Sequence, residues 1–274
     1  RFHGMFAFAI HDRASDRVWL VRDRFGIKPM YLAETEGRLR FASTLPALVA
    51  SGGIDTEIDR AALHHYMTWH AVVPAPRTIL KGVRKLPPAT IREIAPDGTA
   101  TDRVYWEPRF DRSPEDAERS AEEWRDLVLE AFRTAVRRRM VADVPVGVLL
   151  SGGVDSSMIV GLLAEEGQKD LATYSIGFEE AHGEKGDEFQ YSDLIAERYG
   201  TNHHKIFIPS EEMRENLPRA IAAMSEPMVS YDNIGFFLLS REVSKTIKVV
   251  QSGQGADEVF GGYHWYPPLA DAND

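Results

Sequence analysis

The sequence predicts two domains of different architecture: an antiparallel α+β domain over residues 1–110 and a doubly wound parallel α/β domain over residues 111–274. Up to residue 106, short β-branched or aromatic runs are separated by Asp, Gly and Ser turns, which is typical of consecutive antiparallel strands. After residue 113, apolar runs alternate with helical patterns, which is typical of a parallel sheet. With 274 residues, 43% of them hydrophobic, the chain is long enough for two cores.

In the first domain, strands are expected at residues 5–10, 17–21, 29–33 and 38–42. Helices are expected next at residues 44–50 and 59–69, with Asp59 as the N-cap of the second because its carboxylate can accept hydrogen bonds from the first turn. Strands at residues 89–94 and 100–106 complete this domain. Residues 107–113 carry little apolar content, so we expect the linker there.

The second domain is expected to open with one long helix over residues 113–140. Its Ser-Pro-Glu-Asp start is typical of a helix N-terminus, and Trp124, Leu127 and Val128 recur at helical spacing. Strands are then expected at residues 146–150, 171–178, 204–208 and 248–251, with helices at 156–166, 189–199, 211–224 and 235–244. This alternation predicts the parallel, doubly wound sheet.

The composition narrows the classes of function. A net charge of −10 argues against a nucleic-acid partner, because neutralising phosphates requires a clustered positive face. No apolar run reaches the length of a membrane span and no secretory signal layout is present, so we expect a cytoplasmic protein without a membrane partner. A homodimer is a separate expectation for its assembly. The chain does not begin with Met and stops soon after a glycine-rich turn, so we expect a fragment truncated at both ends.

Two residue types bear on metal and nucleophile chemistry. The chain contains no cysteine, which excludes disulfides, thiolate metal sites and a cysteine nucleophile within it. The pairs His64–His65 and His203–His204 lack the i, i+4 spacing that places two ligands on one helix face. Histidine metal sites are therefore not expected at either pair.

Two similar glycine loops occur, SGGID at residues 51–55 and SGGVDSS at residues 151–157. The first follows an expected helix, so its glycines indicate a helix end and turn. The second follows the apolar run VGVLL and opens a helix, and in this strand–loop–helix arrangement free N–H groups and the positive helix end face an anion. Only the second loop is therefore expected to bind a phosphate.

The residues of the second loop fit a magnesium nucleotide. Gly152 and Gly153 permit close backbone approach, and an Asp beside a phosphate requires a bridging cation, for which Mg²⁺ is suited. The Gly-Lys-Ser/Thr ending of a Walker A loop is missing, which disfavours γ-phosphoryl transfer. The loop residues expected to contact the nucleotide or its Mg²⁺ are Ser151, Gly152, Gly153, Asp155, Ser156 and Ser157.

At these motifs the chain resembles a known family. SGGVDSS resembles the pyrophosphate-binding loop of N-type ATP pyrophosphatases, and SGQGADEVFGGY at residues 252–263 resembles the second signature of the asparagine synthetases. In the first half, FHGMFAFAI, RDRFGIKPMY, LRFAS and GVRKLPPAT resemble the glutaminase half of the same enzymes. The resemblance implies an N-terminal-nucleophile glutaminase-type domain followed by an ATP pyrophosphatase domain.

The resemblance also implies a reaction and its residues. ATP adenylylates a substrate carboxylate with release of pyrophosphate, and ammonia from glutamine attacks the acyl-adenylate to give an amide. Asp23 would bind the glutamine α-amino group, although a turn or cap aspartate is the alternative that the residues alone favour. The remaining implied residues are Asp155 and Asp257 for Mg²⁺, Leu150 and Ile176 for backbone contacts to adenine, Ser252 and Gly253 for the nucleotide and acyl-adenylate, and Gln254 as a catalytic position.

The chain departs from the family pattern in two ways. The glutaminase nucleophile of the family is an N-terminal cysteine, which this chain lacks, so the chain as given should not hydrolyse glutamine. Gln254 stands where asparagine synthetases carry glutamate. The stretch at residues 64–90 most resembles the N-acetylglutaminylglutamine amidotransferase branch, which would take a glutamine dipeptide as acceptor. The alternatives are an asparagine synthetase acting on aspartate, a β-lactam-synthetase-like cyclase and a degenerate nucleotide-binding module.

Overall fold

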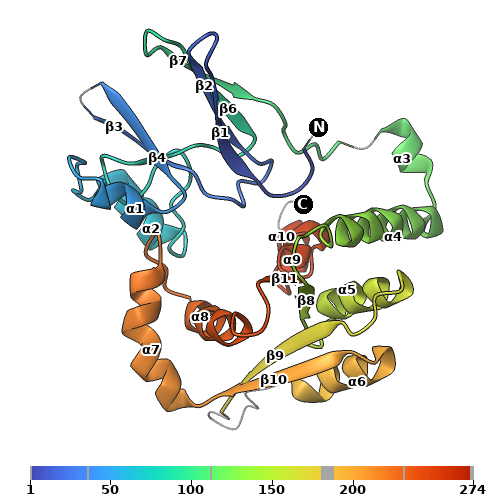
Figure 1. Cartoon of the computed structure of the whole chain (residues 1–274). Coiled ribbons are helices and arrows are strands. Elements are labelled where there is room, and N and C mark those ends of the chain that lie inside the picture. Colours follow the sequence, from blue (N-terminus) through green and yellow to red (C-terminus); the bar gives the residue numbers. More distant parts are fainter. Residues whose placement is uncertain (1, 36, 112, 180–187, 231, 272–274) are drawn as a thin grey trace. The chain divides into compact units, whose positions relative to one another are not determined.

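The computed structural model describes residues 2–35, 37–111, 113–179, 188–230 and 232–271. The chain forms two compact units (Figure 1). Unit 1 comprises Arg1–Asp111 and Ile221–Ser230, and unit 2 comprises Arg112–Ala220 and Tyr231–Asp274. Arg112, in the expected linker, lies outside the described residues.

Unit 1 is built from two antiparallel sheets with two short helices. One sheet has the strand order β1-β2-β6-β7 and the other the order β4-β3-β5. The strands are β1 (Ala7–Asp12), β2 (Arg17–Arg22), β3 (Tyr31–Thr35), β4 (Arg38–Ala42), β5 (Arg84–Lys85), β6 (Thr90–Ile94) and β7 (Ala100–Val104), and the helices are α1 (Leu45–Ala50) and α2 (Arg60–Thr68). Asp59 caps α2 as expected, accepting from the N–H groups of Ala61 and Ala62.

Strand β3 lies between the two core clusters of unit 1. Leu32 packs with Leu20 and Leu86 in one cluster, whereas Tyr31 and Ala33 belong to the other. Because side chains alternate along a strand, one short strand can serve a cluster on each of its faces. This explains why three successive residues of β3, Tyr31, Leu32 and Ala33, are all apolar and buried.

Unit 1 also includes residues 221–230, which comprise the last residues of helix α7 (Ser210–Ala223) and the segment after it. The Glu226 carboxylate accepts a hydrogen bond from the Tyr31 hydroxyl at 3.0 Å and pairs with the Lys85 ammonium group at 2.9 Å. Both side chains of the ion pair are largely buried, 14% and 19% exposed. Burial and this carboxylate raise the pKa of Tyr31. The expected domains, residues 1–110 and 111–274, are continuous stretches of sequence and assign residues 221–230 to the second one.

Unit 2 is a parallel sheet with helices, as the sequence predicts. Its strand order is β10-β9-β8-β11, and every neighbouring pair is parallel. The strands are β8 (Val146–Leu149), β9 (Ala172–Phe178), β10 (Asn202–Ile208) and β11 (Val249–Gln251). From β8 the sheet therefore extends through β9 to β10 on one side, whereas β11 pairs with β8 on its other side. This reversal is the topological switch point at which doubly wound sheets bind ligands, beyond the carboxyl ends of the strands.

The helices of unit 2 agree with expectation except near its start and after residue 255, where two short helices were not expected. They are α3 (Pro114–Glu118), α4 (Ala121–Arg138), α5 (Val154–Glu165), α6 (Phe189–Tyr199), α7 (Ser210–Ala223), α8 (Asp232–Val243), α9 (Ala256–Phe260) and α10 (Tyr266–Asp271). The expectation of one helix over residues 113–140 was wrong, because Arg119 is extended and Ser120 starts a new helix. Ser120 and Glu123 form a capping box there, which supplies partners for the free N–H groups of α4.

Helix α5 and strand β8 fix the loop between them. Val148 and Leu150 pack against Ile159, Val160 and Leu163 in the largest buried cluster of unit 2. Each of these side chains is at most 3% exposed. The loop at residues 151–157 thus begins and ends in the core.

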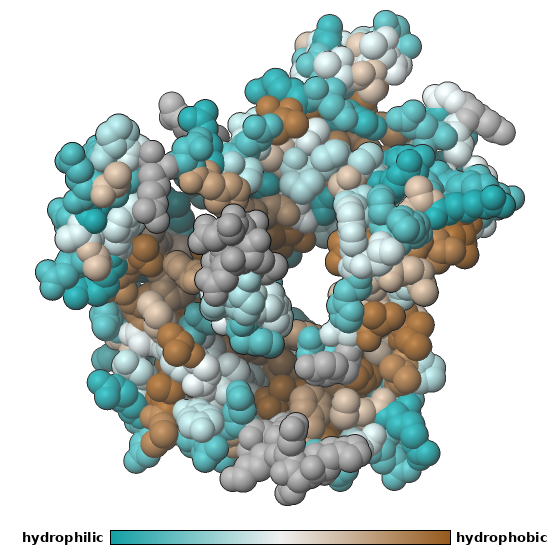
Figure 2. All heavy atoms as spheres, turned by 180° about the vertical axis from the view of Figure 1, so that it is seen from behind, coloured by the Kyte–Doolittle hydropathy of each residue, from teal (hydrophilic) through white to brown (hydrophobic). Residues whose placement is uncertain are grey.

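The surface carries both hydrophilic and hydrophobic side chains. On the face shown in Figure 2, hydrophilic residues alternate with separate hydrophobic patches. Trp124, Leu127 and Val128 of α4 are among the exposed apolar residues. None of the helices in the described ranges combines the length and the apolar character needed to cross a membrane.

Candidate nucleotide-binding site

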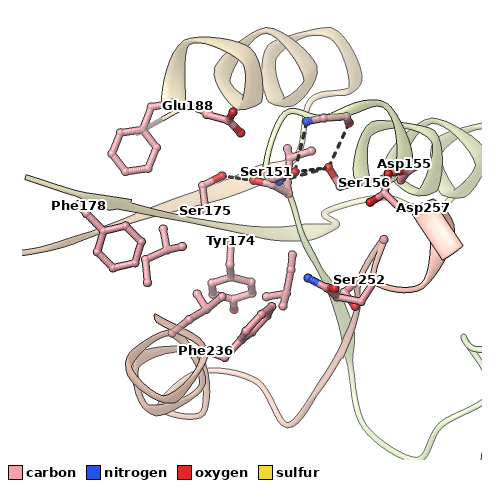
Figure 3. Close-up of a pocket in the computed structure, with 18 residues that line it drawn as sticks. Ser151, Asp155, Ser156, Tyr174, Ser175, Phe178, Glu188, Phe236, Ser252 and Asp257 are labelled. Carbon is pink, nitrogen blue, oxygen red and sulfur yellow. Dashed lines mark hydrogen bonds between the residues drawn. The ribbon is translucent and has the colours of Figure 1, made fainter. Parts of the chain in front are cut away.

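A cavity of about 670 Å³ lies in unit 2 at the switch point. Its walls come from the carboxyl ends of β8 and β9 and from the loop that follows β11. A volume of this size is typical of small-molecule sites. The lining residues that the sequence predicts are Leu150, Ser151, Gly153, Asp155, Ser156, Ile176, Ser252, Gly253, Gln254 and Asp257 (Figure 3).

The first loop presents an open helix N-terminus. Gly153 is the N-cap of α5, and no side chain caps this helix, so its first N–H groups remain available for an anion. Ser156 closes the loop from inside: its Oγ accepts from the Ser151 N–H at 3.2 Å and donates to the Gly153 carbonyl at 3.2 Å. The Ser151 hydroxyl oxygen lies 3.0 Å from the Ser156 Oγ. The loop is therefore ordered by its own serines.

The second loop, at residues 252–257, packs directly against the first. A Cβ on Gly253 would lie 2.9 Å from the Asp155 Cβ and 3.2 Å from the Ser156 nitrogen. Real Cβ atoms do not approach that closely without displacement of a neighbour. Glycine is required here so that the loops following β8 and β11 can touch.

Asp155 and Asp257 both line the polar end of the cavity (Figure 3). Within the described ranges neither carboxylate makes a hydrogen bond or an ion pair. Gly262 provides room for the Asp257 carboxylate, since a Cβ there would collide with it. Two such carboxylates in one cavity suit a bound cation.

The donor set fits Mg²⁺ bound together with phosphates. No group of three or more His, Asp or Glu side chains in the described ranges could hold a metal ion alone. Mg²⁺ in nucleotide sites is usually held by one or two carboxylates plus substrate phosphates and waters. Asp155 and Asp257 supply that number.

The other end of the cavity is aromatic and was not predicted. Phe178, Phe189 and Phe236 come from β9, α6 and α8, and Glu188 also lines the cavity (Figure 3). These residues carry no sequence motif, and only the folding of the sheet brings them together. The cavity thus has one apolar end and one charged end.

Some predicted residues have contacts that the sequence did not indicate. The Leu150 N–H donates to the Tyr174 carbonyl at 2.8 Å, and its carbonyl accepts from the Ser175 hydroxyl. Gly152 and Ser157 do not line the cavity. Gly152 has a φ of +91° and packs against α6, and the Ser157 Oγ is buried without a partner among the described residues.

The SGGID stretch ends a helix, as expected. Ser51 is the C-cap of α1, and Gly52 follows with a φ of +75°. Its N–H donates to the Val49 carbonyl, which closes the last turn. This loop is part of unit 1 and does not line the cavity.

Asp23, in unit 1, is only 1% exposed. Its Oδ1 accepts from the N–H groups of Phe25 at 3.2 Å and Ile27 at 3.0 Å. Its Oδ2 accepts from those of Phe6 at 3.3 Å and Lys28 at 2.9 Å. Four bonds match the lone-pair capacity of a carboxylate. This geometry favours the turn or cap role that the residues alone suggested, and a contact with glutamine stays a prediction.

An Asp23→Ala variant is expected to lower the free energy of unfolding of unit 1 by about 3 kcal/mol, because several backbone donors lose their acceptor. Thermal or urea unfolding monitored by tryptophan fluorescence measures it. Asp97→Ala is the matched control, since that exposed carboxylate accepts one backbone bond, from Thr99. If Asp23→Ala unfolds like the wild type and only the glutamine requirement of the full-length protein rises, the substrate role is the correct one.

The chain thus combines an antiparallel unit with a parallel α/β unit whose cavity lies at the switch point of its sheet. The asparagine synthase family matches residues 127–274, and the glutamine amidotransferase domain family matches residues 1–106. The chain belongs to the asparagine synthase family.

Several curated proteins are similar over nearly the whole chain. Asparagine synthetase (glutamine-hydrolyzing) 1 of Bacillus subtilis is 35% identical over 267 residues, which covers 97% of this chain and 40% of that protein. Asparagine synthetase (glutamine-hydrolyzing) 3 of the same organism is 30% identical over 275 residues, with 96% and 44% covered. A Mycobacterium bovis protein is 37% identical over 270 residues, with 97% and 40% covered. The chain thus spans less than half the length of these relatives.

Proposed function

We propose that the full-length protein is a carbon–nitrogen ligase that uses ATP to adenylylate a carboxylate and amidates it with ammonia from glutamine. The observation that carries this proposal is the meeting of the two signature loops at the switch point, where Gly253 packs against Asp155. The same cavity joins an open helix N-terminus, two unpartnered carboxylates and an aromatic end. Family membership supports the same reaction class.

The two ends of the cavity suit the two parts of ATP. Phe178 and Phe236 offer an apolar surface for adenine, and Ile176 of β9 lines the same cavity. The N–H groups at the start of α5 would receive the phosphates, with charge developing on pyrophosphate as the α,β bond breaks. The open helix end is already in place, so it would stabilise that charge without reorganisation.

Mg²⁺ would be held by Asp155 and Asp257. When bound, it neutralises phosphate charge and so makes pyrophosphate a better leaving group. Ser252 and Gly253 would line the nucleotide and the acyl-adenylate, because both belong to the loop that touches the first loop. Unit 1 belongs by its family match to the glutamine amidotransferases, so glutamine is the proposed source of ammonia.

We propose further that the acceptor is a peptide-like carboxylate such as N-acetylglutaminylglutamine. Gln254 lines the cavity and is exposed to it beside Gly253. An amide there donates and accepts hydrogen bonds but cannot take a proton from ammonium, whereas a glutamate carries a charge beside the acyl-adenylate. Gln254 would orient an acceptor whose own amides need partners, and free aspartate would be a poor substrate.

Acceptor-dependent pyrophosphate release by the full-length protein tests this proposal. With N-acetylglutaminylglutamine the value of kcat/KM is expected to exceed that with aspartate by about 10²-fold or more, because an unmatched polar group in a site costs a few kcal/mol. Gln254→Glu is expected to reduce this preference, and Gln254→Asn is the uncharged control. Efficient turnover of aspartate by the wild type would reject the dipeptide and favour an asparagine synthetase acting on aspartate.

A further inference from the structure

A continuous chain of hydrogen bonds crosses strands β9 and β10 and ends at the start of the nucleotide loop. The Thr201 and Thr173 hydroxyls lie 2.8 Å apart, and the Thr173 hydroxyl lies 2.8 Å from the His203 Nδ1. The His203 Nε2 lies 3.3 Å from the Ser175 Oγ. The Ser175 hydroxyl donates to the Leu150 carbonyl.

The partners fix the direction of these bonds. The Ser175 proton is used on the Leu150 carbonyl, so the Ser175 oxygen accepts from the His203 Nε2–H. In a neutral imidazole the Nδ1 is then an acceptor and takes the Thr173 proton. Burial lowers the pKa of His203, which favours the neutral ring.

An ion pair lies near the ring without a hydrogen bond to it. The nearest carboxylate, Asp193, has its Oδ1 4.0 Å from the Nε2, which is beyond hydrogen-bond distance, and it pairs with Lys205 at 3.0 Å. The His203 side chain is 9% exposed and Ser175 is 4% exposed. Both side chains are thus largely buried, and Ser175 also lines the cavity.

These hydrogen bonds hold one peptide group at both of its polar atoms. The carbonyl of the Leu150–Ser151 peptide is held by Ser175, and its N–H is held by the Ser156 Oγ at 3.2 Å. Because a peptide group is a rigid plane, holding both ends removes its rotation. This peptide leads from β8 into the loop at residues 151–157.

We propose that His203 is a positioning residue for the nucleotide loop: through Ser175 it fixes the Leu150–Ser151 peptide and thereby preorganises the loop that receives the pyrophosphate. The inference deepens the proposed function and rests on it for the identity of the ligand. The neighbouring His204 has another role, since its ring stacks on Tyr174 with the ring centroids 5.0 Å apart. Of this histidine pair, His203 is the residue that connects Thr173 to Ser175 by hydrogen bonds.

The test compares two amide substitutions of His203 whose side chains differ in length. His203→Gln can place an amide N–H near the position of the Nε2, whereas His203→Asn is shorter and reaches Thr173 but not Ser175. Thr201→Val is the control, because it removes a hydroxyl from the chain and leaves the His203–Ser175 bond. Hydrogen exchange of the amides of residues 150–157 is measured without nucleotide, and KM for ATP is measured in the full-length protein.

In His203→Asn the loop amides are expected to exchange about 10-fold faster and the KM for ATP to rise about 10-fold, since loss of preorganisation opens the loop locally. His203→Gln is expected to restore both toward wild type, and Thr201→Val to leave both near it. Ser175→Ala is expected to match His203→Asn, and the double variant to be little worse than either.

Equal loop exchange in His203→Asn, His203→Gln and the wild type would overturn the inference, as would additive effects of Ser175→Ala and His203→Asn. A failure of the proposed function is distinguishable, because it would appear as a wild-type protein that releases no pyrophosphate from ATP. The exchange comparison needs no ligand and would still decide the role of His203 in ordering the loop.

Discussion

An Asp155→Asn variant of the full-length protein is expected to release pyrophosphate from ATP about 10²- to 10³-fold more slowly than the wild type, comparable to the loss of one preorganised transition-state contact. The amide has nearly the shape of the carboxylate but no charge, so it would hold Mg²⁺ poorly. Asp155 makes no hydrogen bond or ion pair within the described part of the chain, so its loss should not unfold unit 2. Acceptor-dependent pyrophosphate release and thermal unfolding are measured together.

Asp55→Asn is the matched control, because Asp55 occupies the corresponding position in SGGID and its exposed carboxylate accepts the Glu57 N–H at 2.8 Å. It is expected to leave turnover within about two-fold, since an exposed turn aspartate contributes little beyond local order. Asp257→Asn should act like Asp155→Asn, and the double variant should be little worse, because residues that serve one ion are not additive. Equal losses from Asp55→Asn and Asp155→Asn would show that the cavity is not the ATP site.

A Gly152→Ala variant is expected to lower the free energy of unfolding of unit 2 by about 3 kcal/mol, combining left-handed backbone strain with overpacking. Its φ is +91°, and an added Cβ would lie 2.5 Å from the Tyr191 Cβ and 2.8 Å from the Ser192 nitrogen. Either the loop or the start of α6 must therefore shift. Because the loop would receive the phosphates, the KM for ATP is expected to rise about 10-fold or more.

Gly52→Ala provides the comparison in the other glycine loop. Gly52 has a φ of +75°, but an added Cβ would meet no atom within 4 Å. The expected cost is only the backbone strain, about 1 to 2 kcal/mol, with no change in KM for ATP. Equal destabilisation of the two variants in urea unfolding would mean that the contact between Gly152 and α6 is not tight.

The strand–loop–helix geometry around residues 151–157 could be predicted from the sequence because its signal is local. An apolar strand, two glycines and an apolar helix follow each other within residues 146–166, and that order fixes where the helix N-terminus points. The same holds for the second loop, which follows the short strand β11. Parallel order in the sheet then brings both loops to one edge.

The aromatic lining of the cavity and the Glu226–Lys85 ion pair could not be predicted, because they depend on contacts between residues far apart in the sequence. Phe178, Phe189 and Phe236 reach one cavity from three elements, and each alone resembles an ordinary core residue. The Glu226–Lys85 pair joins residues 141 positions apart. The break before α4 is different, because the Ser120–Glu123 capping box is visible in the sequence and was outweighed by the longer helical spacing around it.

The phosphorus products of the full-length protein test the central claim most directly. With ATP, Mg²⁺ and the preferred acceptor, ³¹P NMR should show AMP and pyrophosphate in equal amounts, because adenylylation breaks the bond between the α and β phosphates. Asp155→Asn should show neither, and Asp55→Asn should show both. Formation of ADP and phosphate would mean γ-phosphoryl transfer and would contradict the assignment of this cavity as an adenylylating site.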